Sequence, residues 1–363
     1  MKQYRPSYYK DFICIASSCS DNCCIGWEID IDEKTDSFYR SVNGDFGCRL
    51  QKNILRNENG SQFILKGERC PFLNDQNLCD IYINLGEPAL CEICTQHPRY
   101  HEWFGEYKES GVGLCCEAAG RLIFSQESLP SYELVDIDEE NGDSVNEEAY
   151  QALFSAREKA FTLAAQHDWS ALLAFGEALQ EALEWKDWEE IKILTTKEYD
   201  YFCKGVCLFV DLTTVQQLLT FLSELEPIDP KWPQLLQHIQ ENLQDILAAL
   251  PKYKAAYPSW AKDMDQLIHY FIYRYFSKSL FDDDIYSKVA LPLLSAVVVS
   301  LLNAETFLRK GSFTLEDQVF TAKQFSKEIE YCTENLDALY EALWDSNFLS
   351  FRELTALMTQ FFA

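Results

Sequence analysis

Cysteine is the residue type whose spacing most clearly indicates chemistry in this chain. Eleven of the fourteen cysteines lie within the first 116 residues. They begin as a C-x4-C-x3-C-C run and continue as single residues and pairs, namely Cys14, Cys19, Cys23, Cys24, Cys48, Cys70, Cys79, Cys91, Cys94, Cys115 and Cys116. Thiols gathered in one third of a protein predict either a disulfide framework or a metal site built from thiolates.

The expected compartment favours a metal site. Residues 1–12 contain charged residues and tyrosines but no apolar stretch of the kind found in secretory signals. The longest apolar run, 289–302, is too short to span a bilayer and contains Pro292. We therefore expect a soluble, cytoplasmic protein without membrane contact, in which thiols stay reduced. Adjacent cysteines are also awkward for a disulfide framework, so metal binding is favoured over disulfides and over free thiols.

Soft thiolate ligands select zinc or an iron–sulfur cluster. Structural zinc sites usually contain two C-x2-C pairs, and only Cys91 and Cys94 have that spacing here. The C-x3-C-x2-C motif of radical enzymes begins at Cys19 and Cys23, but its third position is Gly26. Spacing alone therefore disfavours radical chemistry and leaves zinc and an iron–sulfur cluster both open.

The charge of the chain disfavours nucleic acid as a partner. The net charge is −27, of which residues 1–120 carry −6 and the remaining residues −21. A protein that binds a polyanion needs a basic surface, which this composition does not provide. An acidic surface would attract basic, lysine-bearing proteins, or it would simply keep the protein soluble. The sequence leaves the oligomeric state open.

Three regions must position the cysteines and whatever they serve. Residues 1–125 form a cysteine-rich region with short strands predicted at 27–32 and 63–66, and short helices at 85–94 and 115–124. A region with so little regular structure would depend on a bound metal for its fold. Residues 126–148 are acidic, contain no Lys or Arg, and are predicted to be a linker or loop.

Residues 149–363 are predicted to form an all-α bundle, so the fold class is mainly α. Apolar residues recur at three- and four-residue steps in 259–280, with Ser259 as the expected N-cap. Thr314 and Asp317 form a capping box that opens a helix expected to reach about Trp344. Similar apolar stripes occupy 148–184, 199–225 and 232–250.

The neighbours of the cysteines match a known family. The matching blocks are Phe12-x-Cys14 with Cys19-x-Asp21-x-Cys23-Cys24-x-Gly26-Trp27, then Cys70-Pro71-Phe72-Leu73, Leu78-Cys79-Asp80-Ile81-Tyr82, Cys94-x2-His97-Pro98-Arg99 and Leu114-Cys115-x-Glu117. These blocks resemble the N-terminal signature of the flagellin lysine N-methylase family. The first two also resemble small bacterial cysteine-cluster proteins that bind zinc or iron.

The resemblance implies methyl transfer from S-adenosylmethionine to lysines of flagellin by a protein that carries a [4Fe-4S] cluster. It also implies eight candidate ligands, namely Cys14, Cys19, Cys23, Cys24, Cys70, Cys79, Cys94 and Cys115. One such cluster takes four thiolates, so some of the eight are structural or a second metal is present. Cys48, Cys91 and Cys116 fall outside the matched blocks and are interpreted as ordinary buried or partly exposed cysteines.

Only a few polar residues in the helical region are candidates for a binding site for the methyl donor or for lysine. Tyr273 and Arg274 lie in an otherwise apolar stretch, and Asp282, Asp283 and Asp284 follow soon after. In the functional interpretation these residues contact the donor or the lysine. In the competing one Arg274 pairs with an acid and Asp282 or Asp283 caps the next helix.

Further patterns are less informative. The chain has neither G-x-G-x-x-G nor G-x-x-x-x-G-K-[ST], so no conventional nucleotide loop places the donor. His97 is interpreted as a neighbour of the metal site rather than a ligand, and Cys203 and Cys207 as core residues. The functional alternative to a methyltransferase is a non-enzymatic protein whose fold is stabilised by the bound metal and which binds a basic partner or senses redox state.

Overall fold

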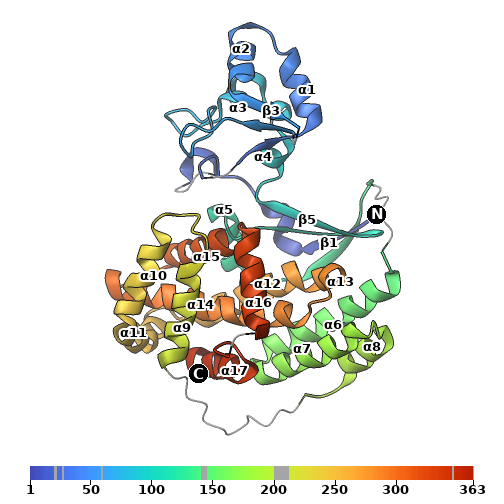
Figure 1. Cartoon of the computed structure of the whole chain (residues 1–363), viewed down its shortest axis with the longest axis vertical. Coiled ribbons are helices and arrows are strands. Elements are labelled where there is room, and N and C mark those ends of the chain that lie inside the picture. The colour runs from blue at the N-terminus through green and yellow to red at the C-terminus, as the bar shows by residue number, and fades with distance from the viewer. Residues whose placement is uncertain are drawn as a thin grey trace.

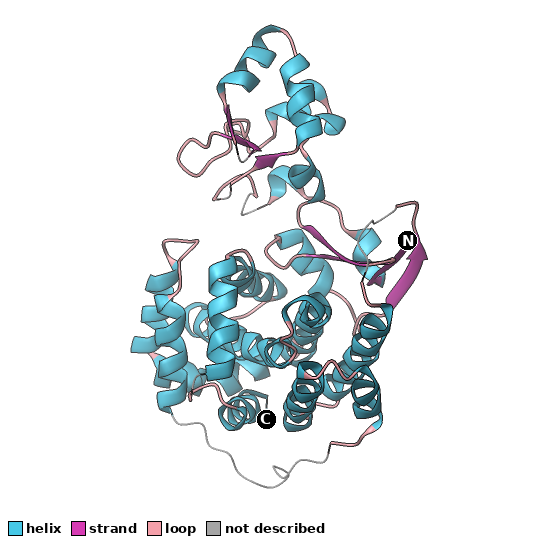
Figure 2. Cartoon of the chain, turned by 45° about the vertical axis from the view of Figure 1, so that its right-hand side comes forward, coloured by secondary structure: helices cyan, strands magenta, loops and turns pink. Residues whose placement is uncertain are grey.

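The computed structural model describes residues 1–19, 23–26, 28–58, 60–139, 145–199, 212–345 and 347–362. A small N-terminal lobe stands apart from a large helical body, and a four-stranded sheet lies between them (Figure 1). Turning the molecule shows that the body consists almost entirely of helices, whereas the lobe mixes short strands and helices (Figure 2). The mainly α fold class is therefore confirmed.

The N-terminal lobe is built on a three-stranded antiparallel sheet. The strands are β2 (Asp30–Ile31), β4 (Gly60–Phe63) and β3 (Ile54–Asn57), in that order. Around them lie α1 (Glu33–Ser41), α2 (Gly44–Lys52), α3 (Asp80–Leu85) and α4 (Glu92–Gln96). Tyr39, Leu50 and Phe72 are fully buried between these elements. The lobe has its own small apolar core, separate from that of the body.

Local predictions in the lobe needed correction. Of the strand expected at 27–32, the described residues 28–32 form a strand only at Asp30–Ile31, and the one expected at 63–66 ends at Phe63. The helix expected at 85–94 is wrong. Gly86 adopts a φ of 85°, which a right-handed helix excludes, and Pro88 follows it, so the chain turns and a new helix begins at Glu92. The helix expected at 115–124 is present as α5 (Glu117–Phe124).

The second sheet joins segments that are far apart in the sequence. Its order is β5 (Arg99–Phe104), β6 (Tyr107–Val112), β1 (Lys2–Pro6) and β7 (Tyr132–Asp136). Strand β1 runs parallel to β6 and antiparallel to β7. Strand β7 lies inside the acidic segment 126–148, so part of that segment is ordered sheet. The domain limits drawn from the sequence remain a prediction.

The helical body packs around one central helix. Its other helices are α6 (Glu147–Ala165), α7 (Trp169–Glu184), α8 (Trp188–Thr196), α9 (Leu212–Glu224), α10 (Trp232–Glu241), α11 (Leu243–Ala256), α12 (Trp260–Tyr275), α13 (Ser279–Asp282), α15 (Leu315–Glu330), α16 (Thr333–Asp345) and α17 (Phe351–Phe362). The central helix is α14 (Tyr286–Lys310), which contacts α7, α11, α12 and α15. It is long and apolar enough to cross a membrane, but 89% of its most apolar stretch is buried in the body, as expected for a core helix.

Helix boundaries in the body were predicted in part. The capping box is confirmed, because Thr314 and Asp317 each bond the backbone of the other. The single helix expected from Thr314 to Trp344 is wrong, since α15 ends at Glu330 and α16 begins at Thr333. Ser259 precedes α12 but its side chain makes no capping bond. Of the stripe at 199–225, residues 200–211, including Cys203 and Cys207, lie outside the described residues.

Candidate metal centre and junction site

Five cysteines meet in the core of the N-terminal lobe. Cys70 and Cys91 are buried there, and Cys24, Cys79 and Cys94 pack against the same apolar cluster. The Sγ atoms of Cys91 and Cys94 lie 3.2 Å apart. Four of the eight cysteines carried over from the family resemblance therefore share one core with Cys91, which the sequence had set aside.

Local backbone structure brings these thiols together from three segments. The backbone N–H of Cys70 donates to the carbonyl of Cys24 at 2.8 Å, which places the two segments side by side. Cys79 is the N-cap residue of α3, and Cys91 is the N-cap residue of α4. Cys94 follows one turn later, so both members of the C-x2-C pair face the same side of α4. That spacing was the signal that could have included Cys91.

The thiols of this core perturb one another. The contact with Cys23 and then burial raise the pKa of Cys24. The contact with Cys91 and then burial raise the pKa of Cys94, while the same contact lowers that of Cys91. Burial raises the pKa of Cys70 to about 11. Several neighbouring thiolates repel one another, and a cation would remove that repulsion.

The five cysteine thiols of this core are of a type that binds metals. Among the described residues, no three His, Cys, Asp or Glu side chains lie close enough together to hold a metal ion. The lobe nevertheless places five soft thiols in one small core, and both zinc and an iron–sulfur cluster need four. The residues present therefore fit such a group in type and number.

The remaining candidate cysteines lie elsewhere. Cys19 and Cys23 interact electrostatically with Cys116, the N-cap residue of α5, at the junction of lobe and body. Cys14 is exposed, and its sulfur accepts a hydrogen bond from the backbone of Ala16 at 3.4 Å. Cys115 is buried and bonds Tyr331 of the body. Cys19 and Cys115 therefore lie at the junction, whereas Cys23 also contacts Cys24 of the thiol core.

Arg274 belongs to a buried ion pair. Its guanidinium lies 3.0 Å from a carboxylate oxygen of Glu330, whose side chain is fully buried. The guanidinium also lies 4.5 Å from the ring centre of Tyr100 and 5.4 Å from that of Tyr331. The interpretation that Arg274 pairs with an acid is confirmed. Its charge is engaged between the junction sheet and the body.

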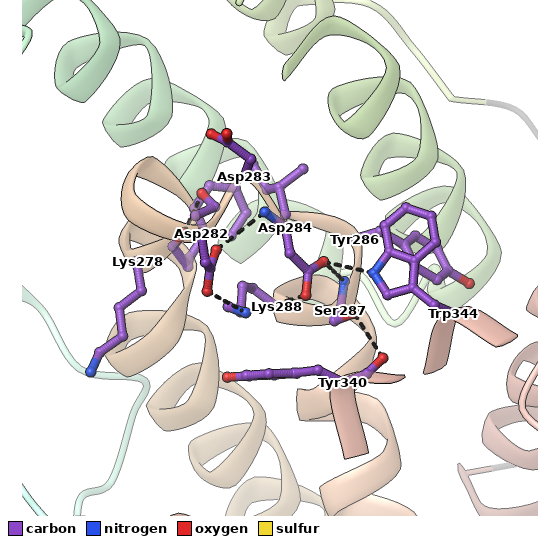
Figure 3. A network of polar contacts seen from close by, with 12 residues as sticks. Lys278, Asp282, Asp283, Asp284, Tyr286, Ser287, Lys288, Tyr340 and Trp344 are labelled. Carbon is purple, nitrogen blue, oxygen red and sulfur yellow. Dashed lines mark hydrogen bonds and ion pairs between the residues drawn. The ribbon is translucent and has the colours of Figure 1, made fainter. Parts of the chain in front are cut away.

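Asp282 and Asp284 enclose a lysine of the protein itself (Figure 3). The ammonium of Lys288 lies 2.9 Å from Asp282 and 3.3 Å from Asp284, and 3.4 Å from the ring centre of Tyr340. Asp284 also accepts a bond from the backbone N–H of Ser287 at 3.0 Å, in the first turn of α14. The helix is therefore capped by Asp284, where the sequence suggested Asp282 or Asp283, and Lys288 already neutralises the acids.

Tyr273 anchors the junction sheet to α12. Its hydroxyl lies 2.7 Å from the carbonyl oxygen of Tyr4 in β1 and 2.9 Å from that of Ser110 in β6. Its ring stacks on Tyr132 with centres 4.8 Å apart. His97 lies at the same junction against Tyr331, and burial lowers the pKa of its imidazole to about 4.

Comparison with known proteins identifies the family of the helical body. A family model described as the FliB lysine N-methylase C-terminal domain matches residues 148–357, more than half of the chain. The chain belongs to the FliB lysine N-methylase family. The family match spans α6 to α17, whereas all cysteines of the lobe lie before it.

Individual relatives of the family are distant. The flagellar biosynthetic protein FliU of Salmonella muenchen is 29% identical over 135 residues, which cover 34% of this chain and 78% of that protein. The lysine-N-methylases of Salmonella choleraesuis and Salmonella typhimurium are each 28% identical over 135 residues. The match spans only a third of the length of these two relatives. No solved structure matches this chain.

Proposed function

We propose that this protein is a protein-lysine N-methyltransferase that uses S-adenosylmethionine and acts on flagellin in the cytoplasm. The observation that carries the proposal is the match of the lysine N-methylase C-terminal domain over residues 148–357. The names of the Salmonella relatives, two lysine-N-methylases and a flagellar biosynthetic protein, support the reaction and the flagellar substrate.

The reaction sets demands that this chain must meet. The lysine amine has to lose a proton before its lone pair can attack, because a free lysine with a pKa of about 10.4 is charged near neutrality. The new N–C bond then forms as the C–S bond of the sulfonium donor breaks, and sulfur keeps the electron pair as a thioether. Positioning of the two substrates supplies much of the acceleration. The net charge of −21 beyond residue 120 would attract a lysine-bearing protein.

We further propose that the thiol core holds a [4Fe-4S] cluster, with zinc as the alternative. Four of the five cysteines of this core, Cys24, Cys70, Cys79, Cys91 and Cys94, would supply the ligands. When bound, such a group would cross-link three segments of a lobe that has only a small apolar core. Polar methyl transfer needs no electron, so a structural role suffices.

One purification and one assay test both parts. The protein is isolated without oxygen and analysed for iron, zinc and acid-labile sulfide, and the same sample is incubated with flagellin and donor radiolabelled on the methyl group. We expect about four iron and four sulfide per chain and label on flagellin lysines. Stoichiometric zinc without sulfide would replace the cluster by a zinc site. A metal-loaded protein that binds no donor and transfers no label would reject the methyltransferase and favour a metal-stapled binding protein.

A further inference from the structure

A partly open cavity of about 300 Å³ lies where the junction sheet meets the helical body. Strands β1 and β7 contribute Tyr4 and Tyr132, α6 contributes Glu158 and Phe161, and α12 contributes His269. The loop 129–131, before β7, closes another side. Figure 1 shows these elements at the edge of the body below β1. None of the residues that line the cavity belongs to the thiol core or to the Lys288 cluster.

Aromatic rings form half of the cavity lining, since four of its eight residues are aromatic. Tyr132 stacks on Tyr4 with ring centres 5.4 Å apart and on Phe161 with centres 5.2 Å apart. Phe161 stacks in turn on the imidazole of His269, with an interplanar angle of 4°. The faces of Tyr132 and Phe161 lie against neighbouring rings, and the guanidinium of Arg157 lies 5.2 Å from the ring centre of Tyr4. The rings therefore give the cavity an apolar lining that suits the methylene chain of a lysine.

One carboxylate completes the wall. Glu158 is exposed, and its Oε1 accepts a hydrogen bond from the hydroxyl of Tyr4 at 3.3 Å. In the part of the chain that the structure describes, no Lys or Arg forms an ion pair with Glu158. The neighbouring cation, Arg157, is fully buried and pairs with Glu109 at 2.6 Å. The negative charge of Glu158 is therefore available to a ligand.

The imidazole adds a hydrogen-bond acceptor. Nδ1 of His269 lies 2.9 Å from the backbone oxygen of Asp265, and a carbonyl can only accept, so Nδ1 carries the proton. Nε2 then keeps a lone pair. Burial lowers the pKa of His269 to about 4, which keeps the ring neutral near pH 7. The carboxylate and the lone pair complement an ammonium group, and the rings complement the methylene chain that carries it.

The walls are held in place before any ligand binds. The side chain of Lys262 in α12 donates to the carbonyls of Phe124 and Gln126 at 2.6 and 3.0 Å, and Gln266 donates to that of Ser128 at 2.6 Å. These bonds anchor the segment that leads into the loop 129–131. At about 300 Å³ the cavity lies at the lower end of the range for small-molecule sites, which suits one side chain better than a whole nucleoside donor.

We infer that this cavity binds the ammonium end of a lysine side chain presented by a protein substrate. The inference rests on the proposed function for the identity of that substrate. Glu158 would pair with the ammonium, and Nε2 of His269 would accept a hydrogen bond from it. The rings of Tyr4, Tyr132 and Phe161 would pack on the methylene chain of the lysine. His269 is assigned here as a positioning residue.

Binding is tested on the full chain with N-α-acetyl-lysine amide, and the neutral probe is N-α-acetyl-norleucine amide, which lacks the ammonium. Ligand-observed NMR titration should show saturable binding of the lysine probe and at least five-fold weaker binding of the norleucine probe. Glu158→Gln and Phe161→Leu should each weaken lysine binding about five-fold. Glu181→Gln, a matched exposed glutamate on α7, should leave it unchanged, and circular dichroism should show equal helix content in all variants.

Two results overturn the inference. One is the loss of either contrast in affinity: the lysine and norleucine probes bind wild type equally, or the lysine probe binds wild type and Glu158→Gln equally. The other is displacement of the lysine probe by S-adenosylmethionine alone, which would assign the cavity to the donor.

The methyl-transfer assay separates this inference from the proposed function. If Glu158→Gln raises the KM for flagellin about five-fold with little change in kcat, both stand. Transfer with an unchanged KM overturns the cavity and leaves the function. Lysine binding that needs Glu158 in a protein that transfers no methyl group overturns the function and leaves the cavity as an ammonium site.

Discussion

The ion pair between Arg274 and Glu330 offers a direct test of whether Arg274 supports the fold or contacts a substrate. The two side chains are 10% and 0% exposed, so removing one charge leaves the other buried without its partner. Losing one member of a buried pair costs about 3–5 kcal/mol of unfolding free energy. Glu330→Gln keeps the shape of the side chain and an acceptor for the hydroxyls of Tyr270 and Tyr275. We therefore expect Glu330→Gln to lower the unfolding free energy by about 3 kcal/mol, near the lower limit of that range.

A double-mutant cycle isolates the pair. Arg274→Met and Glu330→Gln are made singly and together, and urea unfolding is followed by helical circular dichroism, which reports mainly on the body. The double variant should be less destabilised than the sum of the single variants by about 2 kcal/mol. Lys197→Met, which removes an exposed pair with Glu190, should change nothing measurable. A stable Arg274→Met protein that has lost binding of S-adenosylmethionine would refute our assignment and return Arg274 to the donor site.

Three further changes have defined outcomes. Cys94→Ser should lower the metal content of the purified protein, whereas Cys48→Ser, an exposed cysteine of the same lobe, should keep it, and equal loss in both would remove the thiol core as the metal site. Thr314→Ala should cost about 1 kcal/mol in urea unfolding, because it removes the capping box of α15, and an unchanged midpoint would contradict that role. The pKa of His269 is about 4 when folded and 6.5 ordinarily, so the unfolded chain takes up the proton first as the pH falls. Its contribution to stability is complete above pH 6.5 and is lost progressively toward pH 4, and His269→Gln should flatten the pH dependence of unfolding between pH 7 and 5.

The helical body was largely readable from sequence because its signals are local. Apolar residues at three- and four-residue steps and the Thr314–Asp317 capping box depend on neighbours within one or two turns. The missed break between α15 and α16 shows the limit of such signals. No proline or glycine marks residues 331 and 332, and Tyr331 leaves the helix to reach Cys115 across the junction.

The junction sheet could not be predicted, because its central strand appears polar in sequence. Strand β6 buries Lys108, Glu109 and Ser110, residues typical of a surface. Their burial is possible because Lys108 pairs with Glu139 and Glu109 with Arg157, partners 31 and 48 residues away. Period-two alternation of apolar and polar residues, the usual sequence signal of a half-buried strand, does not reveal ion-pair partners so far along the chain.

The thiol core was predictable only as a set of candidates. Cysteine content and spacing indicated a metal site. Which cysteines belong to the thiol core, however, depends on contacts among three segments, such as the hydrogen bond between the backbones of Cys24 and Cys70. The matched family blocks included Cys14 and Cys115, which the structure places at the surface and at the junction. They omitted Cys91, although its C-x2-C spacing was visible.

Contacts at the junction also determine whether the family domain can form the cavity without the N-terminal region. The family match begins at residue 148, so it includes Glu158, Phe161 and His269 but excludes Tyr4 and Tyr132. Tyr4 sits between β6 and β7 in the sheet, and its carbonyl accepts the bond from Tyr273 of the body. The two tyrosines therefore reach the cavity only when the N-terminal strand is docked. A cavity completed in this way would tie lysine binding to the correct folding of the N-terminal region. The thiol core lies within that region, so a structural metal bound there, as proposed, would have a physical route to influence methyl transfer without touching either substrate.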